Sequence, residues 1–151
     1  MLSALVAYLH YLALVVIAIG LTFEYRICSP GLNPTQVQQL VRIDLCYFGA
    51  AMLALATGVA RVFWFGKGMP FYAGNPVFYI KLALFLAMGL ISFPPTRQFL
   101  RWRRAQRAGH AIVPDGEVLR VRRLIAVELL LLAGIPLAAT LMARGIGTPT
   151  P

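Results

Sequence analysis

Long apolar segments separated by short polar links dominate the hydrophobic pattern of this chain. Four of the segments approach or reach the length of about 20 apolar residues that a bilayer-spanning helix requires. They cover about 2–23, 43–65, 77–93 and 124–143. Four spans and their links use up the 151 residues. The pattern therefore predicts an all-α fold: a single transmembrane domain, built as an integral membrane four-helix bundle.

Cap signals predict where the second and third helices start. Asn33-Pro34 precedes the second apolar segment, and Asn75-Pro76 precedes the third. Each pair offers a capping side chain followed by a proline at the first helical position, where its missing N–H is not needed. The first apolar segment lacks a basic n-region and a small-residue cleavage pattern. We therefore expect a retained helix rather than a signal peptide.

Two consecutive prolines, Pro94-Pro95, are expected to end or kink the third span. The segment that follows combines several arginines with Phe99 and Trp102. It predicts a separate amphipathic cytoplasmic helix at about 96–108. Its two rings would lie among lipid headgroups, and its arginines would face anionic inner-leaflet lipids.

Composition supports a membrane protein, and the charge distribution predicts its orientation. Hydrophobic residues make up 60% of the chain and charged residues 13%, which excludes an ordinary soluble domain. The net charge of +9 comes mainly from the first and third links. These links contain Arg26, Arg42, Arg97, Arg101, Arg103, Arg104, Arg107, Arg120, Arg122 and Arg123. Because cytoplasmic loops carry the excess of Lys and Arg, both termini should lie on the outer (periplasmic) side of a bacterial inner membrane, with no nucleic-acid partner.

Three acidic residues fall near the predicted inner boundary. Glu24, Asp44 and Glu128 all lie close in sequence to arginines. An unpaired charge at the centre of a bilayer costs about 2.5–3.5 kcal/mol even on the most lenient scale. Structural ion pairs are therefore the economical explanation, and Glu128 is expected to pair with Arg123 or Arg42.

The half of the predicted bundle on the outer side contains cations and no Asp or Glu. His10, Arg61 and Lys81 belong to three different spans at similar depth, and Lys67 lies in the aromatic-rich link between the second and third spans. Long cationic side chains can extend toward water, whereas histidine is too short to do so. Either His10 bonds to a backbone carbonyl or to a tyrosine of a neighbouring helix, or this half of the bundle binds a ligand.

Haem b is a ligand that would use all of these groups. Its iron takes an imidazole, its macrocycle fits between apolar helices, and its two propionates pair with cations. The predicted metal ligand is His10, and the predicted cofactor-binding residues are His10, Arg61, Lys81 and Lys67. Because no second histidine lies within a span, the sixth iron position is open or taken by another group. The candidates are Lys81, Met52, Met88 and a second protomer.

The whole chain resembles a small bacterial membrane family, domain of unknown function 2214. The segments that carry the resemblance are AYLHYLAL, RVFWFGKG, NPVFYIKLALF and LMARGIG, and it implies the four-helix fold. His10 in the first helix and Tyr79-Ile80-Lys81-Leu82 at the start of the third are also similar to HemJ-type protoporphyrinogen oxidases and the copper-resistance protein D superfamily. In HemJ-type proteins the corresponding histidine and lysine are functional. This second resemblance implies haem b and a catalytic role for Lys81.

We therefore hypothesise a haem b-binding integral membrane redox protein, an oxidase or an electron-transfer protein that acts on a porphyrin or a quinone. Two other classes stay open. One is a transporter or channel subunit for a metal or a small anion, with the cations as its entry site. The other is a structural membrane protein whose polar residues fix the helix packing. Small residues recur on several spans and are compatible with a homo-oligomer.

Overall fold

The computed structural model describes residues 1–65, 72–109 and 112–145, and these ranges form helices and links without a β-strand. The long helices are α1 (Leu2–Ile27), α2 (Pro34–Ala60), α4 (Pro76–Arg107) and α5 (Asp115–Ala143). A π-helical turn, η1 (Arg61–Phe65), extends α2. Each of the long helices is long and apolar enough to cross a membrane. The predicted all-α fold with four membrane-spanning helices is confirmed.

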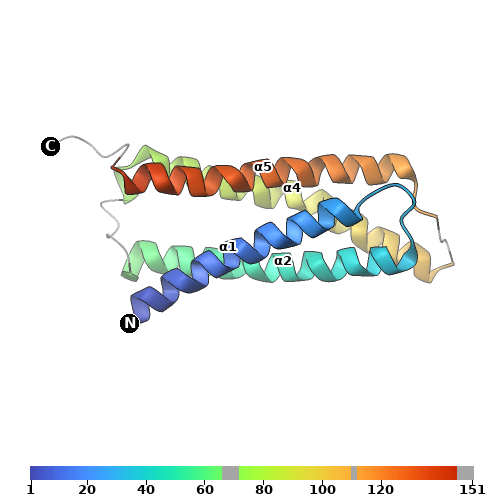
Figure 1. Cartoon of the computed structure of the whole chain (residues 1–151), viewed down its shortest axis with the longest axis horizontal. Helices are drawn as coiled ribbons and strands as arrows, with labels where there is room; N and C mark the ends of the chain where they lie inside the picture. Colours follow the sequence, from blue (N-terminus) through green and yellow to red (C-terminus); the bar gives the residue numbers. More distant parts are fainter. Residues whose placement is uncertain (66–71, 110–111, 146–151) are drawn as a thin grey trace.

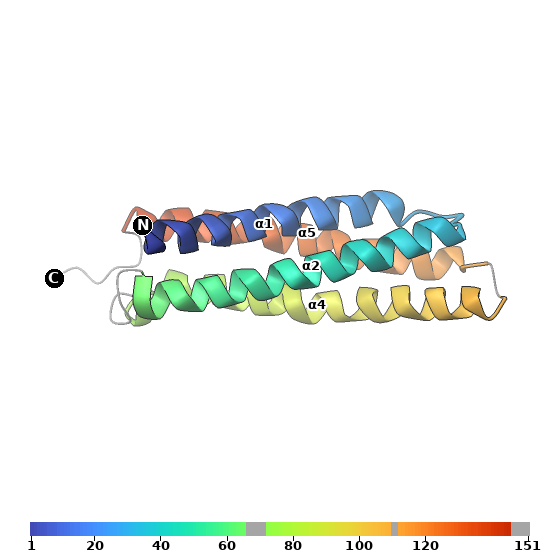
Figure 2. The same ribbon diagram turned by 90° about the horizontal axis from the view of Figure 1, so that it is seen from below.

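The helices run alternately in opposite directions and form two layers (Figure 1). In the view of Figure 2, α1 and α5 lie on one side of the bundle and α2 and α4 on the other. Helix α1 packs on α2 and α5, and α4 packs on the same two helices. The start of α1 and the end of α5 lie at the same end of the bundle, here called the termini end. The opposite end, where α1 and α4 finish, is called the loop end.

Both predicted helix starts are confirmed by their caps. The side chain of Asn33 accepts a hydrogen bond from the Gln36 N–H at 2.9 Å, and the Gln36 side chain accepts one from the Asn33 N–H at 3.0 Å. This reciprocal pair is a capping box, which satisfies two N–H groups that have no partner within the helix. The Asn75 side chain likewise accepts from the Val77 N–H at 2.9 Å.

The prediction of a separate helix over 96–108 is wrong. Helix α4 continues through Pro94 and Pro95 to Arg107 without interruption. Phe99 and Trp102 are buried in the core rather than placed among headgroups. A proline removes one hydrogen bond of the preceding turn but keeps a helical φ. Packing along α5 can therefore hold α4 together beyond the prolines.

The exterior of the bundle is apolar. Leu90 and Leu130 are 77% and 74% exposed, and many other large hydrophobic side chains also face outward. The inward face holds a core that includes Ile17, Leu40 and Ile125, all fully buried. Apolar surface of this extent would be unstable in water. It is what a helix bundle presents to lipid.

Candidate functional site

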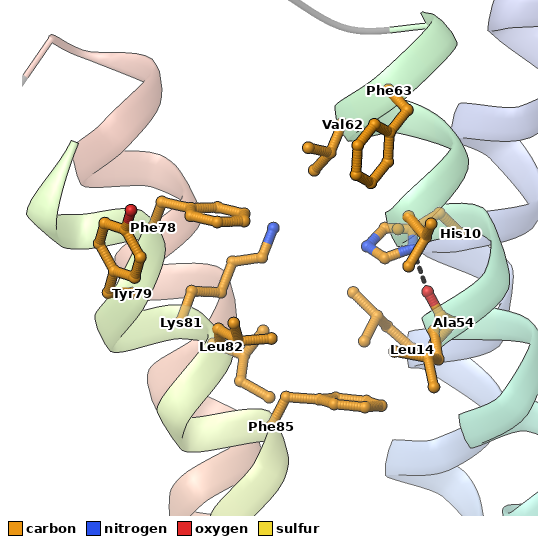
Figure 3. Close-up of a pocket in the computed structure, with 14 residues that line it drawn as sticks. His10, Leu14, Ala54, Val62, Phe63, Phe78, Tyr79, Lys81, Leu82 and Phe85 are labelled. Carbon is orange, nitrogen blue, oxygen red and sulfur yellow. Dashed lines mark hydrogen bonds between the residues drawn. The ribbon is translucent and has the colours of Figure 1, made fainter. Parts of the chain in front are cut away.

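A cavity of about 390 Å³ lies near the termini end of the bundle, between α2 and α4 (Figure 3). Its walls are almost entirely aliphatic and aromatic, and Phe63, Phe78 and Phe85 are among the rings that line it. Two side chains with basic nitrogens also line it, His10 from α1 and Lys81 from α4. The volume falls within the range of roughly 300–1,000 Å³ that is typical of small-molecule sites. A mostly apolar pocket with few polar groups suits a largely apolar ligand.

Hydrogen bonds fix the tautomer of His10. Its Nδ1 lies 3.0 Å from the carbonyl oxygen of Ala54 and 3.0 Å from the hydroxyl oxygen of Thr57. The Ala54 carbonyl can only accept, and the Thr57 hydroxyl donates to the Leu53 carbonyl at 2.6 Å. Nδ1 therefore carries the proton, and Nε2 keeps its lone pair. In Figure 3 the imidazole ring faces the cavity, and the Lys81 side chain extends toward it from α4.

Small residues on α2 provide the space that the His10 ring occupies between α1 and α2. Ala50, Ala54 and Thr57 are buried at helical spacing and let α1 approach closely. A Cβ at position 58 would lie 3.3 Å from Cε1 of His10, so Gly58 leaves the room that the ring occupies. Sequence reasoning missed the roles of Thr57 and Gly58 toward His10. The signal present in the sequence was a run of small residues at helical spacing, and such a run indicates close packing without naming the partner.

The predicted site residues fall into three groups. His10 and Lys81 line one cavity and lie within electrostatic range of each other. Arg61 lies beside the cavity, with its guanidinium carbon 5.4 Å from the centre of the Tyr11 ring. It also interacts electrostatically with both His10 and Lys81. In the part of the chain that the structure describes, none of the three forms an ion pair. Lys67 lies outside the described residues.

The candidates for a sixth iron ligand differ in their position relative to the cavity. Met52 is exposed on the outside of the bundle, and Met88 is buried in the core. Neither of them lines the cavity, whereas Lys81 does. Of the candidates within the chain, only Lys81 is positioned to face a ligand held by His10.

The predicted ion pair of Glu128 is wrong. Arg42 and Arg123 are both exposed, and the ion pair found among the described residues joins Arg101 to Glu117 at 3.6 Å near the surface. Glu128 instead accepts a hydrogen bond from the Tyr47 hydroxyl at 3.3 Å.

The expectation that Glu24 and Asp44 also sit in structural ion pairs fails in the same way. Both are buried, and neither has an ion-pair partner within the described ranges. An arginine stays charged at any ordinary pH, so it is costly to bury, whereas a carboxyl group can be buried in its neutral form.

These observations define a multi-pass membrane protein with an apolar cavity between its helices, lined by two basic side chains, His10 and Lys81. Residues 2–147 match the family described as "Predicted membrane protein (DUF2214)", and the chain belongs to that family. No curated protein and no solved structure matches the chain.

Proposed function

We propose that this membrane protein binds haem b and acts in a redox reaction, as an oxidase or electron-transfer protein for a porphyrin or a quinone. The observation that carries the proposal is the orientation of His10, whose Nδ1 is bound to the Ala54 carbonyl while Nε2 has no hydrogen-bond partner among the described residues at an apolar cavity. Histidines that bind metals commonly donate their other N–H to a carbonyl or carboxylate in this way. The similarity of His10 and Lys81 to the functional histidine and lysine of HemJ-type proteins supports the same assignment.

The residues around the cavity fit haem b better than a bare metal ion. Within the described ranges, no group of three or more His, Cys, Asp or Glu side chains is placed to hold an ion. Haem iron needs only one or two ligands from the protein, because the macrocycle supplies the rest. The apolar walls suit the macrocycle, and Lys81 and Arg61 supply positive charge for its propionates.

Each residue has a distinct proposed role. His10 is the metal ligand, held in place by Ala54 and Thr57. Lys81 binds the cofactor and is the proposed catalytic residue, because its ammonium group reaches the cavity and can hold an anionic group or donate a proton to a bound substrate. When bound, haem supplies one-electron chemistry. The aliphatic and aromatic walls offer few hydrogen-bond partners to water beside the reacting groups.

A second candidate function is the transport of a small anion. The observation that favours it is Lys81 itself, a cation that lines an apolar cavity in a half of the bundle without Asp or Glu. If the protein is an anion transporter, His10 links α1 to α2 by its hydrogen bond to the Ala54 carbonyl and binds no metal. The two candidates differ in one measurable property, the visible absorption of the protein.

For orientation, we propose a bacterial inner membrane with the termini end outside and the loop end in the cytoplasm. Ten arginines lie in the loop-end parts of the four long helices, whereas the sequence places Lys67 and Arg144 outside the predicted spans on the other side. Anionic inner-leaflet lipids are the expected neighbours of these arginines. Reporter fusions after the C-terminus and in the 104–109 region test this orientation. A cytoplasmic signal from the C-terminal fusion would overturn it.

The test of haem binding is an absorption spectrum of the full chain, purified in detergent from haem-replete cells and then titrated with haemin. We expect a Soret band in the wild-type protein. His10→Ala should abolish the band while gel filtration still shows a folded protein. His110→Ala provides the matched histidine control, and it should keep the band. A wild-type protein that shows no Soret band and does not bind haemin would contradict the proposal and favour anion transport.

A further inference from the structure

Three carboxyl groups from three helices lie buried toward the loop end of the bundle. Glu24 of α1, Asp44 of α2 and Glu128 of α5 are 2%, 9% and 1% exposed. They are near enough to one another to interact electrostatically. The proposed haem function uses none of them.

Hydrogen bonds distinguish Glu24 from the other two. The Tyr47 hydroxyl donates to Oε2 of Glu128 at 3.3 Å, and the Thr96 hydroxyl of α4 donates to Oδ1 of Asp44 at 2.8 Å. In each case one carboxyl oxygen has a donor, a contact that both the ionised and the protonated carboxyl group can accept. Oε1 of Glu24 is buried and has no hydrogen-bond partner among the described residues. A buried polar oxygen without a donor is costly, so Glu24 is the carboxyl group whose charged form has the least support.

Within the described ranges, no cation neutralises the three carboxyl groups. No described arginine forms an ion pair with them. Arg122 of α5 lies 4.4 Å from the centre of the Tyr25 ring and interacts with the Cys28 thiol at the end of α1. The groups that α4 contributes beside the carboxyls are the neutral hydroxyls of Ser92 and Thr96. Among the described residues, the Tyr47 phenol of α2 and the Cys28 thiol also interact with these carboxyl groups.

Three ionised carboxylates cannot share this site without compensation. Two carboxylates in one buried site already resist ionising together, and burial in an apolar medium adds a further penalty. The compensating positive charge must come from a metal ion or a proton. No group of three or more His, Cys, Asp or Glu in the described ranges is arranged to hold an ion. The proton is therefore the ligand that the geometry favours.

We propose that Glu24, Asp44 and Glu128 form a proton-binding site inside the membrane, and that Glu24 is the group that takes up and releases the proton. Uptake converts the Glu24 carboxylate into a carboxylic acid, which transfers no electron and breaks no covalent bond. The site goes beyond the proposed haem function, because it uses different residues in the other half of the bundle. It gives the protein a means of binding a proton on the side of the bundle where α1 ends.

Infrared spectroscopy of the full chain in phosphatidylcholine nanodiscs tests the site directly. At pH 7, the wild-type protein should show the C=O stretch of a protonated carboxyl group, and the band should shift in D₂O. Labelling with ¹³C-glutamate should shift it further, which assigns the band to Glu without any substitution. Glu24→Gln should remove the Glu24 share of the band. Glu117→Gln, a matched substitution in the surface ion pair, should leave the band unchanged.

Three results would overturn the proposal. The first is a wild-type protein without a protonated carboxyl band at pH 7. The second is a band that keeps its full area in folded Glu24→Gln. The third is a rise in thermal midpoint on replacing choline chloride with NaCl, KCl or CaCl₂ at constant ionic strength in the wild type but not in Glu24→Gln. That third result would assign a metal cation to the site. If Glu24→Gln does not fold, the ¹³C-glutamate measurement is made on Glu128→Gln. A remaining glutamate band then reports Glu24, because Glu117 lies in the surface ion pair, and its absence would overturn the proposal.

Discussion

Toward the termini end, the bundle holds His10, Lys81 and Arg61 without Asp or Glu, whereas toward the loop end it buries Glu24, Asp44 and Glu128, which form no ion pair among the described residues. The cavity side of the bundle therefore holds basic groups, and the other half buries acidic ones. His10 and Glu24 lie on the same helix 14 residues apart, which corresponds to about 21 Å at the rise of an α-helix. That separation is far beyond ion-pair distance. The two sets of charges cannot neutralise each other within one chain.

The difference between the halves lies in how each set can be compensated. Arg61 cannot lose its proton under ordinary conditions, so the cationic half calls for an anion from outside the chain. A carboxyl group can become neutral by binding a proton, so the acidic half needs no partner molecule. The same low-dielectric interior thus favours a ligand-binding cavity in one half and a proton site in the other. The predictions below test this difference between the two halves, starting with the largest expected effect.

Reversing the charge of Lys81 should weaken haemin binding the most among these variants. Lys81→Glu places a carboxylate in the cavity, where it repels propionates and pairs with the neighbouring Arg61. Hydrogen bonds to charged groups contribute about 1.5–3 kcal/mol, which corresponds to roughly 10- to 100-fold in affinity. Haemin titration monitored at the Soret band measures the effect, and Lys81→Arg should retain binding. Equal affinity in Lys81→Glu and the wild type would show that Lys81 does not hold the ligand.

The sequence was sufficient to predict the helices and the cationic half. Hydropathy predicted the four spans, and Asn33 and Asn75 predicted two helix starts, because caps depend on residues adjacent in sequence. The grouping of His10, Arg61 and Lys81 followed from their depth along three spans, since helical rise converts sequence position into depth. The structure adds that only two of the three line the cavity.

Features that depend on packing between helices could not be read from the sequence. Pro94 and Pro95 signal a helix end locally, but contacts between α4 and α5 keep the helix continuous. The Glu128 partner is Tyr47, which is 81 residues away in sequence, whereas the prediction chose Arg123 or Arg42 from the inner boundary. Rotation of each helix about its axis decides which of these groups face inward, and hydropathy does not fix that rotation.

Removing the hydroxyl of Tyr47 should destabilise the acidic half. Tyr47→Phe leaves Oε2 of Glu128 buried without its donor, and an unsatisfied buried polar group costs about 1–3 kcal/mol. We expect a lower thermal midpoint of the purified protein in detergent. Tyr8→Phe is the matched control, because Tyr8 is exposed on the lipid-facing side of α1 and should be neutral. Similar midpoints for both variants would show that the Tyr47 hydroxyl does not stabilise the acidic half.

Filling the space beside His10 should have a smaller effect. In Gly58→Ala, the added Cβ would lie 3.3 Å from Cε1 of His10, and the ring must move by a few tenths of an ångström. Overpacking at the low end costs about 1 kcal/mol, so haemin affinity should fall roughly fivefold. Gly49→Ala on the same helix meets nothing within 4 Å and should leave affinity unchanged. If Gly49→Ala lowered haemin affinity more than Gly58→Ala, the His10 imidazole would not be part of the binding site.

The smallest effect is expected at Cys28, which reports whether water reaches the acidic half from the loop end. Its thiol is fully buried and donates to the Val118 carbonyl at 3.6 Å, and burial raises its pKa to about 12. At pH 9 only about one thiol in a thousand is then ionised, whereas an ordinary cysteine with a pKa near 8.5 is mostly thiolate.

In a Cys46→Ser background, maleimide should therefore leave Cys28 unmodified from pH 7 to 9 until the protein is unfolded. A cysteine moved to the neighbouring, half-exposed position by Ser29→Cys, with Cys28→Ser, should react and accelerate as the pH rises. Rapid modification of Cys28 itself in the folded protein would show that water enters beside Glu24, and the carboxyl groups would then be solvated rather than neutralised by a bound proton.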